Sequence, residues 1–152
     1  MEKQCEKTER REFLTQALTL VGGCMCAGWV AGCETDVLKS SNVAVRFDVS
    51  NASSLSQVGG SMKQIFGGQH GGAPVVIIRQ GEEDFLVLSS ICTHQQCEVN
   101  LPGEGDPQIW CECHDSIFDR TSGAVLEGPA PSPLPRFEST YDKGTQTLTI
   151  QF

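Results

Sequence analysis

The sequence predicts an all-β domain of short antiparallel strands, and three observations support this prediction. Beyond residue 42, apolar side chains form short runs, some of which alternate with polar residues as strands do. Glycine pairs and prolines separate these runs, which is typical of turns. No segment beyond residue 42 keeps a helical period, although residues 52–66 are compatible with one short helical turn.

Four runs are the expected strands: Val43–Val49, Val75–Arg79, Phe85–Ser89 and Thr145–Phe152. The first and the last alternate between apolar and polar side chains, whereas the middle two are almost continuously apolar. A glycine-rich segment around His70 is expected to be a solvent-exposed hairpin tip, with no functional role for the histidine.

Length and charge limit the classes of function. The chain has 152 residues, enough for one domain with a modest core, and a formal charge of −8. We expect no nucleic-acid partner, because a nucleic-acid binder needs a basic face to displace the counterions of phosphate. An acidic surface suits solubility alone, or docking to a basic partner, and both alternatives stay open.

The amino-terminal segment is expected to be a targeting signal. Residues 13–33 carry no charge and follow Arg10 and Arg11, but their glycines and polar residues make them a weak membrane-spanning helix. The stretch TERREFL resembles the twin-arginine export signal, which implies export of an already folded, cofactor-loaded protein. A short amphipathic helix packed on the domain is the alternative.

The end of this segment offers two modes of membrane attachment. Residues 30–33, Val-Ala-Gly-Cys, resemble the lipobox of bacterial lipoproteins, which implies acylation of Cys33. An uncleaved signal-anchor helix is the other possibility. Both place the folded part at the periplasmic face of the cytoplasmic membrane. The predicted organisation is a signal or anchor over residues 1–33, a linker over 34–42 and a folded domain over 43–152.

The eight cysteines fall into two groups, which indicates two functions. Four lie before residue 34 and four lie between residues 92 and 113. In the second group, two of the three histidines of the chain stand beside cysteines, in the segments CTHQQC (92–97) and CECHDS (111–116). Cysteine and histidine at close spacing are typical of a metal site, and at this level a structural zinc module remains a remote alternative.

The C-x-H and C-x-x-H segments resemble the two cluster-binding loops of Rieske [2Fe–2S] proteins. This resemblance implies that Cys92 and Cys111 bind one iron as thiolates and that His94 and His114 bind the other iron through imidazole nitrogens. It also implies one cluster per subunit, with a potential of about −150 to +300 mV. The implied fold is an antiparallel β sandwich with a small cluster-binding subdomain of loops, preceded by an amino-terminal signal or anchor helix.

Further residues extend the resemblance. Cys97 and Cys113 resemble the disulfide that ties the cluster loops together in the Rieske proteins of cytochrome bc and bf complexes, and a disulfide suits an exported domain. Residues 128–134, GPAPSPL, resemble the proline-rich third loop that covers the cluster. Ser116 matches the serine whose hydroxyl donates to a bridging sulfide.

Five positions depart from the respiratory pattern of the family. That pattern reads CTHLGC and CPCHGS followed by tyrosine, whereas Gln95, Gln96, Glu112, Asp115 and Phe118 stand at its Leu, Gly, Pro, Gly and Tyr places. In the family the apolar leucine tip contributes to quinol docking. The departures therefore concern the redox partner, not the cluster.

The resemblance implies electron transfer by an oxidoreductase subunit, not by a stand-alone enzyme. The first hypothesis is the iron–sulfur subunit of a quinol:cytochrome c-type (bc/bf) oxidoreductase, with a quinol or another upstream donor and a c-type cytochrome acceptor. A free-standing exported electron carrier is one alternative, and a small subunit of an arsenite-oxidase-like enzyme is another.

Overall fold

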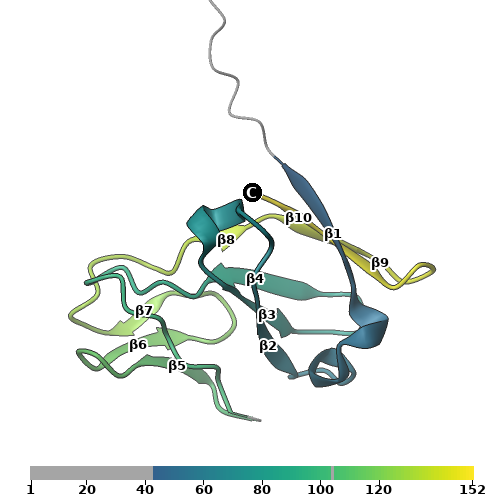
Figure 1. Cartoon of the computed structure of the whole chain (residues 1–152). Coiled ribbons are helices and arrows are strands. Elements are labelled where there is room, and N and C mark those ends of the chain that lie inside the picture. Colours follow the sequence, from purple (N-terminus) through teal and green to yellow (C-terminus); the bar gives the residue numbers. More distant parts are fainter. Residues whose placement is uncertain (1–42, 104) are drawn as a thin grey trace, which may run out of the picture. The chain divides into compact units, whose positions relative to one another are not determined.

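The computed structural model describes residues 43–103 and 105–152 (Figure 1). The expected signal or anchor over residues 1–33, the linker over 34–42 and the lipidation candidate Cys33 lie outside the described residues. In the part that is described, no helix combines the length and the apolar character needed to cross a membrane.

The described residues form three antiparallel sheets, as the all-β prediction requires. Their strands are β1 (Ala44–Asp48), β2 (Ser61–Gln64), β3 (Val75–Arg79), β4 (Phe85–Ser89), β5 (Gln108–Cys111), β6 (Ser116–Asp119), β7 (Val125–Glu127), β8 (Arg136–Phe137), β9 (Ser139–Asp142) and β10 (Thr147–Gln151). The strand orders are β1-β10-β9, β2-β3-β4-β8 and β5-β6-β7. Three single turns of 3-10 helix, η2 (Val49–Asn51), η3 (Ser53–Leu55) and η4 (Gln69–Gly72), lie between the first strands.

The central sheet β2-β3-β4-β8 is covered on both faces, which explains the continuous apolar runs of β3 and β4. Val76, Ile78, Leu86 and Leu88 point to one face and pack in the core shared with β5 and β6. The alternate side chains of β3 and β4 point to the other face and pack against β1 and β10. Figure 1 shows β5–β7 on the opposite side of the central sheet from β1, β9 and β10.

Residues 90–135 form one excursion whose two ends lie on neighbouring strands. The chain leaves the central sheet at the end of β4 and returns at β8, where Leu88 pairs with Arg136. The backbone N–H of Ser89 donates to Pro135 O at 2.8 Å and closes the base of the excursion. All residues of the predicted cluster loops therefore belong to a subdomain with a fixed base.

The sequence predicted the longest strands well and the short ones poorly. β3 and β4 have the predicted bounds, and β1 and β10 lie within the predicted runs. β2 and β5 to β9 were not predicted, because each is at most four residues long and several carry polar or cysteine side chains.

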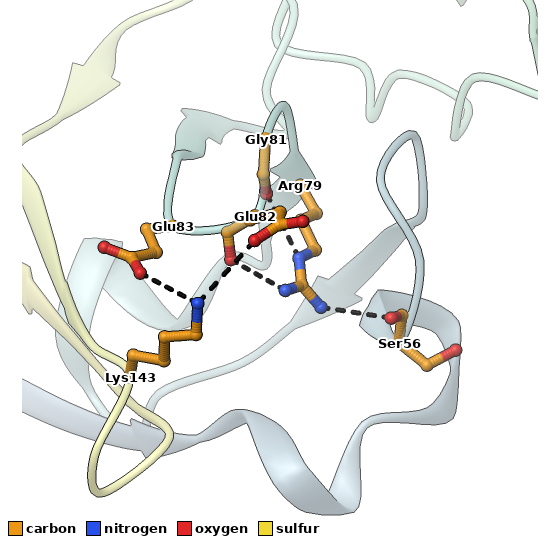
Figure 2. Close-up of polar contacts among 6 residues, drawn as sticks. All are labelled: Ser56, Arg79, Gly81, Glu82, Glu83 and Lys143. Atoms are coloured by element: carbon orange, nitrogen blue, oxygen red, sulfur yellow. Dashed lines mark hydrogen bonds and ion pairs between the residues drawn. The ribbon is translucent and has the colours of Figure 1, made fainter.

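Arg79, at the end of β3, ties two loops together (Figure 2). Its guanidinium donates to Leu55 O at 2.9 Å, Ser56 O at 3.1 Å and Glu82 O at 2.7 Å. Beside it, Lys143 lies 3.1 Å from Glu83 and 3.6 Å from Glu82, both exposed pairs that contribute little to stability.

Gly60 should not tolerate a side chain. A Cβ at this position would lie 2.0 Å from Ser54 O, a backbone atom that cannot rotate away. We expect Gly60→Ala to lower the free energy of unfolding by about 2–4 kcal/mol, in the range of other overpacking changes. Chemical denaturation measures the change, and Gly68→Ala is the control, because a Cβ there meets no atom within 4 Å. Equal stability of the two variants would contradict this packing.

Candidate iron–sulfur site

The first cluster loop follows β4 and turns back on itself. The Cys92 N–H donates to Cys97 O at 2.7 Å, and the Gln96 N–H donates to Cys92 O at 3.0 Å. The Cys92 side chain points into the core and is 1% exposed, whereas Gln95 and Gln96 lie at the surface. His94, which precedes the two glutamines, is half-buried.

The second cluster loop is the turn of the β5–β6 hairpin. Cys111 and Ser116 are paired across the two strands and both point inward, with exposures of 1% and 0%. The four residues between them form the turn, so His114 is presented at the surface. Strand pairing therefore places a buried thiol and an exposed imidazole three residues apart.

The two loops bring the four predicted ligands together. Cys92 and Cys111 are free buried cysteines whose side chains interact, and the His94 and His114 rings meet edge to face with centroids 4.6 Å apart. Burial raises the pKa of the Cys111 thiol, and the neighbouring Cys92 raises this pKa further. The thiols lie in the core, whereas His94 is half-buried and His114 is exposed.

His94 shows an unfilled bonding position. Its Nδ1 is buried and has no hydrogen-bond partner among the described residues, whereas buried polar atoms are normally satisfied. A bound metal would accept this nitrogen as a ligand. A single structural zinc ion needs four ligands around one point. A two-iron cluster instead needs two pairs of ligands, and the paired thiols and paired imidazoles fit this requirement.

A disulfide joins the two loops. Cys97 and Cys113 are bonded with a Cα–Cα distance of 6.5 Å, within the range of protein disulfides. Cys97 belongs to the first cluster loop and Cys113 to the second, so the bond limits how far the loops can separate. The pairing implied by the resemblance is confirmed.

The proline-rich loop is fixed to both cluster loops. The Ala130 N–H donates to Ser116 Oγ at 3.0 Å in a buried setting, and the Thr93 hydroxyl donates to Ser132 O at 2.6 Å. Because Ser116 Oγ accepts from Ala130, its own hydroxyl proton stays available to donate to another acceptor. Sequence reasoning did not single out Thr93, and a threonine inside a ligand motif gives no signal of a contact 39 residues away.

Two departures from the family pattern adopt the backbone conformation that glycine favours. Gln96 and Asp115 stand at the glycine places of the two loops and have φ of 58° and 59°. Left-handed backbone costs roughly 1 kcal/mol for most residues, but Asp tolerates it better. The loops therefore keep the geometry of the pattern without its glycines.

Comparison with known proteins agrees with this site of paired thiols and imidazoles. The family model of the Rieske [2Fe-2S] domain matches residues 45–138, which is more than half of the chain. The chain therefore belongs to the Rieske [2Fe-2S] family. The [2Fe–2S] cofactor is confirmed at the level of the family, and the all-β antiparallel fold agrees with it.

The relatives found are iron-sulfur subunits of ubiquinol-cytochrome c reductases and a plasma membrane Rieske protein. The chain is 41% identical over 59 residues to the ubiquinol-cytochrome c reductase iron-sulfur subunit of Bradyrhizobium diazoefficiens, covering 38% of this chain and 32% of the relative. It is 44% identical over 58 residues to the subunit of the same name from Rickettsia felis. The chain thus spans about a third of the length of these relatives. The solved plasma membrane Rieske protein of Synechocystis PCC 6803 has a TM-score of 0.50 and 25% identity, over 60% of this chain and 86% of that one.

His70 differs from its prediction. It was expected at an exposed hairpin tip, but its ring is half-buried and packs edge to face on Phe137 with centroids 5.1 Å apart. Its Nε2 lies 2.9 Å from Ser89 Oγ, which also accepts the Ile91 N–H at the start of the first cluster loop. The glycines around it indicated a turn correctly but could not show what the turn packs against.

His70 should make stability depend on pH near neutrality. Burial lowers the pKa of His70 in the folded chain, so the unfolded chain binds the extra proton first as pH falls. We expect stability to be retained above the ordinary histidine pKa of about 6.5 and to fall as pH drops through it. Denaturation at several pH values measures this loss. The variant His70→Gln should lose less stability over the same pH range, and an equal loss would show that other groups cause it.

Proposed function

We propose that this chain transfers single electrons as the iron–sulfur subunit of a quinol:cytochrome c-type oxidoreductase. The observation that carries the proposal is that two loops of a Rieske domain bring together a pair of buried free thiols and a pair of imidazoles, one of which is exposed. The curated relatives carry the name of such a subunit and support the larger assembly.

In this proposal Cys92 and Cys111 hold one iron and His94 and His114 hold the other. When bound, the cluster accepts and releases one electron at a time, and its neutral imidazole ligands raise its potential above that of all-thiolate clusters. The buried cysteines keep water away from the thiolate side. His114, exposed in the turn of the β5–β6 hairpin, provides the side from which a partner approaches.

The polar tip supports a second candidate, the free-standing electron carrier. Gln95, Gln96 and Glu112 are all exposed, at places where the family pattern has Leu, Gly and Pro. A polar tip is less suited to an apolar quinol site than the leucine of that pattern. A small subunit of an arsenite-oxidase-like enzyme is a further alternative, which no contact in the described residues favours.

We also infer export and membrane attachment through residues 1–33. The Arg10-Arg11 pair before a charge-free stretch supports the twin-arginine route, and the Val-Ala-Gly-Cys sequence ending at Cys33 supports lipidation. The disulfide adds independent support, because disulfides persist in oxidising compartments such as the periplasm.

Iron and sulfide analysis of the purified full chain tests the cluster and its ligands. We expect two irons and two sulfides per chain, together with a Rieske EPR spectrum. His94→Ala and His114→Ala should each lose the cluster iron and sulfide and the EPR spectrum. His70→Gln is the matched control, since it alters the remaining histidine of the chain and should keep the iron. A colourless zinc protein, or full iron content in the double variant of His94 and His114, would contradict the proposal. Copurification with a b-type haem subunit from membranes would distinguish the oxidoreductase from the free carrier.

Ser116 and Phe118 should set the reduction potential. A donor to a cluster sulfur stabilises the reduced state, because the added electron increases the charge on sulfur. One such bond is worth about 1–2 kcal/mol, or roughly 40–90 mV for one electron. We expect Ser116→Ala to lower the potential by this amount. Phe118 is buried in the same core as Cys92 and Cys111, and Phe118→Tyr should raise the potential.

Voltammetry measures both changes. Ser90→Ala is a control for the serine, because the buried Ser90 hydroxyl already donates to Pro74 O at 2.6 Å and should not affect the potential. We expect the unaltered chain to have a potential in the middle of the Rieske range, below relatives that carry the tyrosine. An unchanged potential in Ser116→Ala would show that its hydroxyl does not reach the cluster.

A further inference from the structure

The outer face of the β5-β6-β7 sheet carries a partly exposed apolar centre, in which Trp110 is exposed and Ile117 is half-buried. Trp110 and Ile117 are directly opposed across β5 and β6, on the face that points away from the core. Glu127 of β7 is paired with Ile117, beside a shift in strand register between Ile117 and Phe118. Trp110 is 45% exposed, and Leu126, next to Glu127, is 54% exposed. Exposed tryptophan is unusual on a free surface and is enriched in protein interfaces.

The charges around this centre have one sign. Between residues 90 and 135 the sequence has seven carboxylates and a single cation, Arg120. Arg120 is 7% exposed, and its guanidinium donates to the backbone carbonyls of Gly103, Asp106 and Gly59, so it adds no positive charge at the surface. The exposed carboxylates whose positions the structure describes are Glu98, Asp106, Glu112, Asp115 and Glu127.

One of these carboxylates is already neutralised and the others are not. Lys63 of β2 lies 2.5 Å from Glu98, where it pairs the first cluster loop with the central sheet. Glu112, Asp115 and Glu127 have no ion pair among the described residues. These three remain available to a cation brought by another molecule.

The apolar centre and the exposed imidazole share one hairpin. Trp110 lies four positions before His114, on the strand that leads into the turn, and Glu112 and Asp115 flank His114 in that turn. A strand advances about 3.3 Å per residue, so a protein seated on Trp110 would also cover the turn. Its cofactor would then come close to the redox site.

We propose that the outer face of β5–β7 is the docking surface for a basic redox protein. Its centre is Trp110 and Ile117, and its rim is formed by Glu112, Asp115 and Glu127. The partner is a one-electron haem protein whose haem edge is surrounded by lysines. This inference rests on the proposed function, in which one electron leaves the reduced chain and converts ferric haem to ferrous haem. The carboxylates steer the encounter, and Trp110 supplies contact area once the partner has arrived. Such complexes are small and short-lived, which suits repeated electron transfer.

Binding and electron transfer to a lysine-rich c-type cytochrome test the surface. The full-length, cluster-loaded chain is titrated with this cytochrome by calorimetry, and its oxidation is followed by stopped flow. We expect affinity and rate to fall as salt is raised, and both to fall for the same cytochrome after its lysines are acetylated. Trp110→Ala should weaken binding by about fivefold or more, as a central interface residue does. Glu127→Gln should weaken it by about twofold, as a rim charge does.

Matched controls exist on the rest of the chain. Ile65 is 55% exposed beside β2, outside residues 90–135, and Ile65→Ala should leave the affinity unchanged. Glu138 is exposed between β8 and β9, and Glu138→Gln should also have no effect. Trp110→Ala, Glu127→Gln and the two control variants should all keep the iron content and reduction potential of the unaltered chain.

Other results would overturn the inference without affecting the proposed function. One is salt-independent binding that Trp110→Ala does not change, in a chain with an intact cluster. Another is a dimer in sedimentation that Trp110→Ala dissociates, which would show that a second copy covers this face. Conversely, if the cluster is absent, the proposed function fails, whereas calorimetry with the cytochrome still reports on the docking surface.

Discussion

The cluster-binding segment begins at strand β4 and ends at strand β8, which are hydrogen-bonded neighbours in one sheet. The geometry of the site depends on this pairing. Leu88 is paired with Arg136, and the Ser89 N–H donates to Pro135 O, so 46 intervening positions (90–135) are anchored at one point of the central sheet. Because β4 is buried along its whole length, this point lies in the interior of the described chain. Loops that start from a rigid base keep a better defined conformation than loops between mobile elements. A site made of loops needs this support.

Three further links hold the loops to one another. The Cys97–Cys113 disulfide joins the two ligand loops, the Thr93 hydroxyl holds the proline-rich loop to the first, and the Ala130 amide holds it to Ser116 of the second. Each loop is therefore connected to the other two by a bond other than those to a metal. A site organised in this way needs little rearrangement when an electron arrives, which favours fast transfer.

The surface around the site differs in polarity from its interior. The thiols and Phe118 are buried with aliphatic side chains, whereas the rim carries glutamines and unpaired carboxylates. The interior therefore suits the cluster of the family, while the polar rim departs from the family pattern described above. Gln96 and Asp115 show how such a change is possible, since both replace glycine and still adopt the left-handed backbone.

The sequence alone identified Cys92, His94, Cys111 and His114 as candidate ligands, because cysteine and histidine at close spacing are typical of a metal site. It also determined β3 and β4, because short, unbroken apolar runs between turn residues are typical of buried strands. Tertiary structure decided what local patterns do not encode. The four-residue strands β5 and β6 exist because they pair and cover the central sheet, and His70 is half-buried because a turn folds onto Phe137. The pairing of Trp110, Ile117 and Glu127 across β5, β6 and β7 likewise follows from strand register, which depends on partners distant in the sequence.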